Sequence, residues 1–395
     1  MRILYIVSAM FPYGWAYAAR ARTIAKLISE CGHTITVMSD YLSDDIDWIS
    51  DNYARYGKIN IVTTSCLKAS QRRLIDKLLV PIRVKRTFGD YIKKNHVDCI
   101  ICDQITNKYL SVKKIAKEKN IPFILEVREW YSYKNWKYGI LDIRFWTFLY
   151  CWHQKFPNEK NIICISKKLE KLFDKKFVNS VRIPAILDTR DKNTKIHKDK
   201  KNFYKLVFIG GINGGKDELF NLIEVICEND LPFYVEIYGP SETDILNTVP
   251  LNNNIRDKFK KKVHIHGFIN QQLLKDKIVE CDYGIIIRPK RRSSDAGFPT
   301  KLGEYLAAGL PVIVNDTSDI CLYIKNRKNG FILQDNSKKS ILNILNEICM
   351  LTNNEYKQMS DNAYTTAINY FDYRNYITKM DIFLKEVLEK RKIYD

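Results

Sequence analysis

The sequence predicts an α/β protein of two doubly wound domains, each with a parallel β-sheet covered by helices on both faces. The chain has 395 residues, which exceeds the size of one ordinary domain. Short apolar runs alternate with amphipathic helical stretches along most of its length, the pattern typical of parallel sheets. A polar stretch at residues 188–202 contains almost no large apolar residue, and we interpret it as a linker between the two halves.

The composition limits the class of protein. With 46% hydrophobic and 28% charged residues the chain is globular and not disordered. The ten cysteines are scattered and lie mostly in apolar runs, which indicates reduced core residues of a cytosolic protein. A net charge of +19 favours anionic partners such as nucleotides, phospholipid headgroups or nucleic acid. The apolar residues 1–11 resemble a short signal peptide, but we interpret them as a buried strand because a helix and a second strand follow.

The first half alternates strands with helices. Strands are predicted at residues 2–8, 34–39, 59–64, 97–102, 122–127 and 161–165. Helices are predicted at residues 18–31, 72–95 with an interruption at Pro81, 109–119 and from Ser166 onward. Residues 130–156 form a long aromatic segment.

The second half repeats this alternation. Strands are predicted at residues 205–209, 233–238, 263–266, 283–287, 311–314 and 331–333, with helices that include 218–227, 271–279 and 373–391. The predicted organisation is an N-terminal Rossmann-like domain (1–190), a linker (191–203), a C-terminal Rossmann-like domain (204–372) and a terminal helix (373–395). Ligands bind at the carboxyl ends of parallel strands, so we expect a cleft between these edges.

The strongest chemical signal is the segment SDAGFPTKLGEYLAAGLPVIVN at residues 294–315. Pro299 and Thr300 open a short helix, and its free backbone N–H groups suit a diphosphate. Lys301 adds a positive charge there. Glu304 lies one turn further on, where a carboxylate can accept hydrogen bonds from ribose hydroxyls.

Two further segments follow predicted strands. FIGGINGGK, residues 208–216, is a glycine-rich turn that lets phosphates approach the backbone, with Lys216 at its end. His264 and His266 alternate on the predicted strand before Gly267. As metal ligands they would need a carboxylate or a third histidine nearby, and none is evident in the sequence, so no metal site is predicted.

These segments resemble the donor-binding signature of glycosyltransferase family 4, retaining enzymes of the GT-B fold. The signature is matched by Gly297, Phe298, Glu304, Ala307, Gly309, Pro311 and Val312. The variety it is most similar to occurs in capsule and lipopolysaccharide transferases. The resemblance covers nearly the whole chain and is sharpest in its second half, and it implies that the terminal helix crosses back to the N-terminal domain.

The resemblance implies a role for each matched residue. Lys216, Glu304 and Glu129 would be catalytic, with Glu304 also on the ribose, and Glu126 and Arg128 are alternatives to Glu129 as the residue that points into the cleft. The donor diphosphate would lie on Gly211, Lys216, Arg288, Pro299, Thr300 and Lys301. The other assignments are the donor sugar to Asp295, Gly297 and Phe298, the nucleobase to Gly267 and Phe268, and the N-domain cleft loop to Gly14 and Trp15.

The chain departs from the family pattern at two positions. The glutamate that contacts the donor sugar falls on Ala296, with Asp295 one residue earlier, which leaves open whether Asp295 replaces it. The arginine of the glycine-rich turn is replaced by Gly211, and Arg288, Lys290 and Arg291 are the candidates for the second cation, with Arg288 favoured.

Two N-terminal stretches suggest contact with an anionic membrane. Residues 68–94 carry nine Lys and Arg against two Asp, and residues 130–152 are crowded with Trp, Tyr and Phe. Basic charge beside aromatic side chains suits a bilayer interface. A solvated basic helix and an ordinary aromatic core are the alternative interpretation.

Together these patterns predict a glycosyltransferase, and the resemblance implies surface polysaccharide synthesis with retention of anomeric configuration. It would move a sugar from a nucleotide-diphosphate donor to a glycan or lipid-linked saccharide, without a metal or other cofactor and without nucleic acid as a partner. We expect it in the cytoplasm or at the inner face of the cell membrane. The alternatives are a sugar-nucleotide epimerase or hydrolase of the same architecture, or a non-catalytic nucleotide- or nucleic-acid-binding protein.

Overall fold

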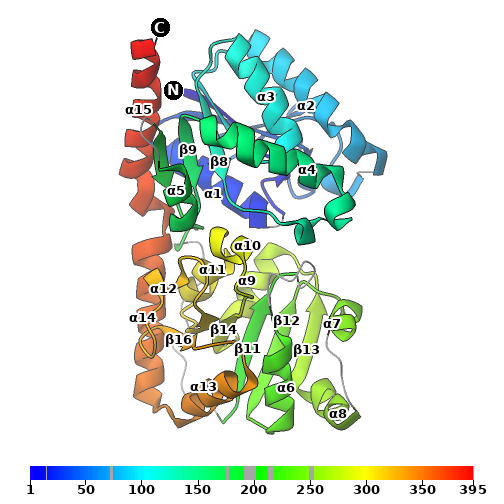
Figure 1. Cartoon of the computed structure of the whole chain (residues 1–395), viewed down its shortest axis with the longest axis vertical. Coiled ribbons are helices and arrows are strands. Elements are labelled where there is room, and N and C mark those ends of the chain that lie inside the picture. Colours follow the sequence, from blue (N-terminus) through cyan, green and yellow to red (C-terminus); the bar gives the residue numbers. More distant parts are fainter. Residues whose placement is uncertain are drawn as a thin grey trace. The chain divides into compact units, whose positions relative to one another are not determined.

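The computed structural model describes residues 1–14, 16–71, 74–136, 138–174, 178–190, 202–211, 218–248 and 253–394. These residues form two compact units (Figure 1). The first comprises Met1–Leu187 together with Tyr373–Asp395, and the second comprises Asp188–Asp372. Most of the predicted linker lies outside the described residues.

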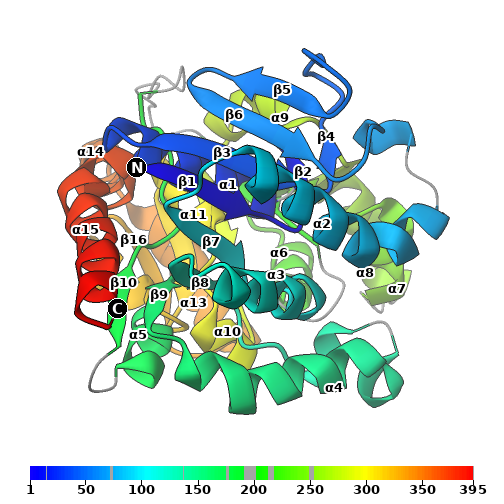
Figure 2. The same cartoon turned by 90° about the horizontal axis from the view of Figure 1, so that it is seen from above.

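The first unit contains an eight-stranded sheet in the order β10-β9-β8-β7-β1-β3-β6-β5, which can be followed in Figure 2. Among the described strands of this sheet only β5 is antiparallel, and it pairs with β6. The strands are β1 Arg2–Ile6, β3 Thr34–Ser39, β5 Tyr53–Tyr56, β6 Ile59–Thr63, β7 Cys99–Asp103, β8 Phe123–Val127, β9 Asn161–Cys164 and β10 Asn179–Arg182. Short strands β2 Met10–Phe11 and β4 Tyr41–Leu42 form a separate parallel pair.

Helices cover both faces of this sheet: α1 Ala16–Glu30, α2 Leu74–Lys94, α3 Thr106–Glu118, α4 Ile143–Tyr150 and α5 Lys167–Phe173. The terminal helix α15, Ile377–Tyr394, also belongs here and packs against α1 and β10 (red in Figure 1). Its buried side chains Met380, Phe383, Leu384 and Val387 join the core formed by β1, β3 and α1. The residues after the second unit therefore complete the hydrophobic core of the first.

The second unit is a six-stranded parallel sheet in the order β13-β12-β11-β14-β15-β16. Its strands are β11 Tyr204–Ile209, β12 Phe233–Tyr238, β13 Val263–Gly267, β14 Tyr283–Ile286, β15 Val312–Asn315 and β16 Gly330–Leu333. Its helices are α6 Phe220–Glu228, α7 Glu242–Thr248, α8 Asn253–Lys262, α9 Gln271–Val279, α10 Arg292–Ala296, α11 Lys301–Ala307, α12 Ile320–Tyr323, α13 Lys338–Met350 and α14 Asn353–Phe371. In sequence order the strands run 3-2-1-4-5-6, the order of dinucleotide-binding sheets.

The predicted fold class is confirmed, since each unit has a doubly wound sheet with covering helices that is parallel apart from the edge strand β5. Periodicity found the buried strands because each is a short apolar run. It missed the edge strands β5 and β10, whose residues alternate between buried and more exposed positions and include polar side chains. The predicted interruption at Pro81 was wrong: α2 continues through it, because Val84 and Phe88 are fully buried and hold the helix on the unit.

Each sheet has one topological switch point, at which the order of the strands reverses and the chain continues toward the opposite edge of the sheet. In the first unit this switch lies between β1 and β7, and in the second between β11 and β14. Crevices at the carboxyl ends of such strands are where ligands bind in open α/β sheets. Among the described helices none is both long and apolar enough to cross a membrane.

Candidate functional site

Glycines bring three loops of the second unit together at the carboxyl ends of β11, β12 and β13. Gly239 has a φ of +118°, and a Cβ placed on it would lie 2.7 Å from the carbonyl oxygen of Gly210. The N–H of Gly239 also donates to the carbonyl oxygen of Gly267 at 2.7 Å. Only glycine allows this close approach at position 239. The loop containing the predicted diphosphate residue Gly211 is thereby held beside the loop containing the predicted nucleobase residues.

The segment around α11 is fixed to the end of β11. The N–H of Ile209 donates to the Tyr305 hydroxyl at 2.9 Å. The ammonium of Lys301 lies 4.2 Å from the centre of the Phe208 ring, and the Lys301 side chain is largely buried. Because these pairs join positions about a hundred residues apart, the fold places the two strongest sequence motifs next to each other. Glu304, half-buried, follows one turn after Lys301 on the same helix.

Gly284 on β14 makes room for this arrangement. A Cβ at Gly284 would lie 2.3 Å from the ring of Tyr305, which is fully buried. We therefore expect Gly284→Ala to destabilise the protein by about 1–3 kcal/mol, because the tyrosine ring must leave its place and release Ile209. Chemical denaturation measures this change.

Gly89→Ala on α2 is the matched control for Gly284→Ala. A Cβ at Gly89 meets no atom within 4 Å, and alanine favours a helix interior, so this change should stabilise by about 0.5–1 kcal/mol. Equal effects of the two substitutions would contradict the packing argument.

Arg288, the favoured second cation, lies directly after β14 and is 5% exposed. Its guanidinium donates to the carbonyl oxygen of Ser294 at 2.9 Å. The side chain of Asn315 accepts from the Arg288 N–H at 2.9 Å and donates to the Arg288 carbonyl oxygen at 2.6 Å. Arg288 therefore ties α10, which contains Asp295, to the sheet, while Lys290 and Arg291 are exposed.

The predicted donor-sugar residues follow this arginine. Asp295 is half-buried within α10, and Gly297 is the C-cap of that helix. Phe298 is 7% exposed and packs edge-on against Tyr323. Pro299 is buried, and Thr300 precedes α11 as its N-cap residue.

The nucleobase prediction concerns the end of β13. Gly267 has a φ of +64°, and Phe268 after it is 67% exposed. The preceding histidines contact a carboxylate that the sequence analysis missed: Glu236 on β12 is 2.9 Å from His264 Nδ1 and 2.6 Å from His266 Nε2. No carboxylate near these histidines was evident in the sequence, because Glu236 is brought to them by strand pairing and not by sequence proximity. Among the described residues no cluster of three His, Cys, Asp or Glu is arranged to hold a metal ion.

Two predicted residues, Lys216 and Trp15, lie outside the described residues. Gly14, which precedes Trp15, is described, and so is Gly211 at the start of the turn that ends with Lys216. A Cβ at Gly14 would lie 2.7 Å from the Met10 side chain, so this glycine is packed against β2. At Gly211 the same position meets no atom of the described residues within 4 Å.

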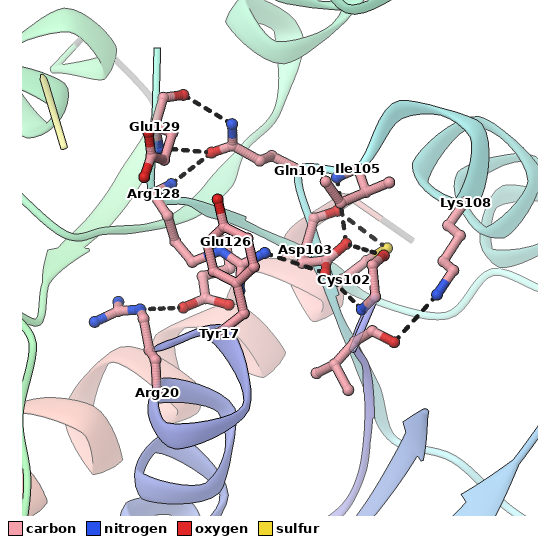
Figure 3. A network of polar contacts seen from close by, with 12 residues as sticks. Tyr17, Arg20, Cys102, Asp103, Gln104, Ile105, Lys108, Glu126, Arg128 and Glu129 are labelled. Carbon is pink, nitrogen blue, oxygen red and sulfur yellow. Dashed lines mark hydrogen bonds and ion pairs between the residues drawn. The ribbon is translucent and has the colours of Figure 1, made fainter. Parts of the chain in front are cut away.

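The first unit holds a buried network of charged residues at the carboxyl edge of its sheet (Figure 3). Glu126 on β8 accepts hydrogen bonds from Arg20 at 2.6 Å and from the Tyr5 hydroxyl at 2.5 Å. Arg20 also donates to the carbonyl oxygens of Pro184 and Ile183. Burial acts to raise the pKa of Glu126, but Arg20, Arg128 and these hydrogen bonds outweigh it and leave the pKa below its ordinary value.

Asp103 joins three loops of this edge. It accepts hydrogen bonds from the Ser8 N–H at 2.7 Å, from the Ile105 N–H at 3.2 Å and from Arg128 at 3.1 Å. Arg128 is buried and lies over the ring of Tyr17, with 4.5 Å between the guanidinium carbon and the ring centre. The loops that follow β1, β7 and β8 are therefore held together around one carboxylate (Figure 3).

Gln104 and Lys108 complete the network. The Gln104 side chain accepts from the N–H groups of Arg128 at 2.5 Å and Glu129 at 3.0 Å, and donates to the Glu129 carbonyl oxygen at 2.7 Å. Lys108 pairs with Asp40 after β3 and donates to the Val7 carbonyl oxygen at 3.2 Å. Fixed loops at a switch point are a preorganised surface for a ligand.

The three residues of the first unit that were predicted to point into the cleft differ in burial and pairing within this network. Glu126 is buried and paired with Arg20, and Arg128 is buried and paired with Asp103. Glu129 is half-buried on the loop that Gln104 fixes. Sequence reasoning missed Asp40, Asp103, Gln104 and Lys108. Three of them stand directly at the carboxyl ends of predicted strands, and that position was an available signal.

Comparisons with known proteins find one family model that matches part of this chain and several solved structures with a similar fold. The family model "Glucosyltransferase 3-like, C-terminal domain" matches residues 229–378. Comparison with curated proteins returns no match. Among solved structures, the chain is similar to sucrose-phosphate synthase from Thermosynechococcus elongatus, with a TM-score of 0.70 and 11% identity over 99% of this chain and 100% of that one.

Two further solved structures are similar over the same length. A glycosyltransferase from Rickettsia africae gives a TM-score of 0.67 and 16% identity over 98% of each chain. HepE from Anabaena, solved in complex with UDP and glucose, gives a TM-score of 0.66 and 13% identity over 98% of this chain and 100% of that one. Since these likenesses extend over nearly the whole chain, the protein has the GT-B fold of glycosyltransferases.

Proposed function

We propose that this protein is a retaining glycosyltransferase that moves a sugar from a nucleotide-diphosphate donor to a hydroxyl of a glycan or lipid-linked saccharide. The observation that carries the proposal is the fixation of α11 to the end of β11 by the Tyr305 and Lys301 contacts. These contacts support the proposal because they lie at the β11/β14 switch point, where Glu304 and the start of the glycine-rich turn would offer a nucleotide diphosphate a ribose acceptor and a phosphate site.

The proposed chemistry follows from where charge develops. As the bond between the sugar C1 and the diphosphate oxygen breaks, negative charge grows on the leaving group. Lys216, Lys301, Arg288 and the backbone amides near Gly211 and Thr300 would stabilise it without a metal. The acceptor oxygen would attack C1 from the same face, and its proton would pass to the departing phosphate oxygen. Asp295, Gly297 and Phe298 would hold the donor sugar, and Gly267 and Phe268 the base.

The first unit would bind the acceptor. Glu129 lies on a loop that Gln104 holds in place, and it would contact the acceptor or the donor sugar together with the Gly14–Trp15 loop. We place the enzyme in surface polysaccharide synthesis, of the capsule or lipopolysaccharide kind, at the cytoplasmic face of a membrane with peripheral contact to anionic lipid. The net charge of +19 is in keeping with both a nucleotide-sugar and an anionic surface.

A thermal-shift screen tests the donor site, with UDP first because the structurally similar HepE was solved with UDP. GDP, CDP, dTDP and ADP follow. A nucleotide at about a hundred times its dissociation constant should add roughly 2.7 kcal/mol of stability. Glu304→Ala should weaken binding of that nucleotide by about 10- to 100-fold, because the ribose hydroxyls lose a charged acceptor.

Glu280→Ala is the matched control for Glu304→Ala, since Glu280 is exposed at the end of α9 and pairs with Lys277 at 2.8 Å. Glu280→Ala should leave nucleotide binding unchanged.

If no nucleotide raises the melting temperature of the wild type, the donor site is misassigned. Product analysis with and without acceptor separates a transferase from a hydrolase or epimerase of the same fold.

A further inference from the structure

The most unusual surface of the first unit is an exposed apolar stretch in and before α4. Its large side chains are exposed to solvent by fractions that are rare for residues of this kind in a folded unit. Leu141 is 86% exposed, Ile143 78%, Tyr138 62%, Ile140 58%, Trp146 56% and Tyr150 49%. We name these six residues the α4 apolar surface. Figure 2 shows α4 along the outer edge of the first unit.

The backbone that presents this surface is well ordered by its own contacts. Asp142, almost fully buried, caps α4 through the Arg144 N–H at 3.0 Å and binds the Arg144 guanidinium at 2.6 and 2.8 Å. The indole N–H of Trp146 donates to the Ile140 carbonyl oxygen at 2.8 Å. The exposed residues are therefore held outward by a fixed turn and do not result from a loose loop.

A buried aromatic core supports the surface from below. Phe148 packs against Trp152 and Tyr131, with ring centres 5.4 and 5.2 Å apart, and Trp152 packs against Phe156 at 6.0 Å. The aromatic segment that the sequence analysis treated as one feature thus divides into two sets. One set forms an ordinary core, and the other projects away from it.

The exposed charged side chains of the segment that carries the surface are basic. Between residues 130 and 158 the chain contains a single acidic residue, Asp142, and its carboxylate is buried and paired with Arg144. The exposed charged side chains of the same stretch include Lys134 and Lys155. An apolar surface with basic and without exposed acidic residues is complementary to a bilayer with anionic headgroups.

We propose that the α4 apolar surface inserts into the interfacial region of an anionic bilayer, with Leu141 and Ile143 deepest and Lys134 and Lys155 on the headgroups. This rests on the proposed function and names the surface through which the enzyme meets its membrane. The surface is also linked to the network at the sheet edge. Tyr131, beneath α4, hydrogen-bonds Tyr17 at 2.8 Å, and Tyr17 lies under Arg128. A lipid-linked acceptor would thus bind close to α4, the element that faces the membrane.

Vesicle co-sedimentation of the full chain tests the proposal. The vesicles are phosphatidylcholine alone and equal parts of phosphatidylcholine and phosphatidylglycerol. The wild type should bind the mixed vesicles more tightly. Leu141→Asp with Ile143→Asp should weaken this binding roughly 100-fold, because two large aliphatic side chains no longer leave water. Lys134→Glu with Lys155→Glu should weaken binding to the mixed vesicles at least about tenfold and affect the neutral ones less.

Met350→Asp is the matched control, since Met350 is 77% exposed at the end of α13 in the second unit. It should bind vesicles as the wild type does. Acyl-chain bromination gives a second readout: quenching of tryptophan fluorescence should depend on Trp146 and be largely lost in Trp146→Phe.

Three results would overturn the proposal. One is a wild type that does not bind the mixed vesicles, and another is a double aspartate variant that binds like Met350→Asp. The third is a wild-type dimer that this double variant converts to a monomer, because the surface would then meet a second copy. Transfer to a soluble acceptor should persist in all these variants, so failed vesicle binding with normal transfer would remove this inference and leave the proposed function in place. Normal vesicle binding without nucleotide binding would remove the proposed function and leave the membrane-binding surface in place.

Discussion

Replacing Glu126 by alanine should destabilise the first unit by about 3–5 kcal/mol, because it leaves Arg20 buried without its carboxylate. Tyr5 loses the acceptor of its hydroxyl in the same change. Urea denaturation monitored by circular dichroism measures the effect. A double variant, Arg20→Met with Glu126→Leu, removes both charges and should recover most of the loss, since no buried charge then remains unpaired.

A surface ion pair provides the matched control for Glu126→Ala. Lys385 and Asp381 lie 2.6 Å apart on α15 with the lysine exposed, so Lys385→Ala should change stability only slightly. The dependence of stability on pH should also reflect the Arg20–Glu126 pair. Because the pKa of Glu126 is lowered in the folded protein, its contribution is present above the ordinary glutamate pKa and is lost as the pH falls through the lowered value. A stability of Glu126→Ala equal to that of the wild type near neutral pH would show that the pair contributes nothing.

Replacing Lys216 by alanine should lower kcat by about 100- to 1,000-fold, because a fixed positive charge no longer meets the charge that develops on the leaving diphosphate. The effect should fall mainly on kcat, with a smaller change in KM for the donor. Initial-rate kinetics with the nucleotide-sugar identified by the thermal-shift screen measure it. Lys216→Arg should recover part of the rate, since it keeps the charge with a different shape.

Lys339→Ala serves as the control for the lysine of the glycine-rich turn. Lys339 is an exposed residue at the start of α13, and its replacement should leave both constants unchanged. Turnover of Lys216→Ala equal to that of Lys339→Ala would remove Lys216 from the proposed mechanism. Another cation, with Arg288 and Lys301 first, would then have to act on the diphosphate.

The segments of the proposed donor site were easier to recognise in the sequence than the network in the first unit. Its residues lie in two short segments, 208–216 and 294–315, where glycine, proline and strand ends are neighbours along the chain. The network instead joins Tyr5, Arg20, Asp103, Glu126 and Arg128 from four separate places in the chain. No local spacing relates these four places, so the pairing could not be predicted before the order of the strands was known.

The contact of the Glu236 carboxylate with His264 and His266 is a second arrangement that local sequence spacing could not predict. The two histidines were visible as an alternating pair, but Glu236 is 28 residues before the first of them. Pairing of β12 with β13 in register puts Glu236 opposite His264. Strand order and register are long-range properties, and a carboxylate on the neighbouring strand is therefore invisible to motif reasoning.

The amino-acid sequence by itself determined the alternation of strands and helices, the division into two α/β units and the two segments of the candidate donor site, because each depends on side chains within a few positions of one another. Only the tertiary structure decided which charges are paired: Glu126 is the buried partner of Arg20, Arg128 is the buried partner of Asp103, and Glu129 is partly exposed. It also decided which aromatic residues of 130–156 form a core and which project from α4. The physical reason is that burial and pairing are set by contacts between elements far apart in the chain.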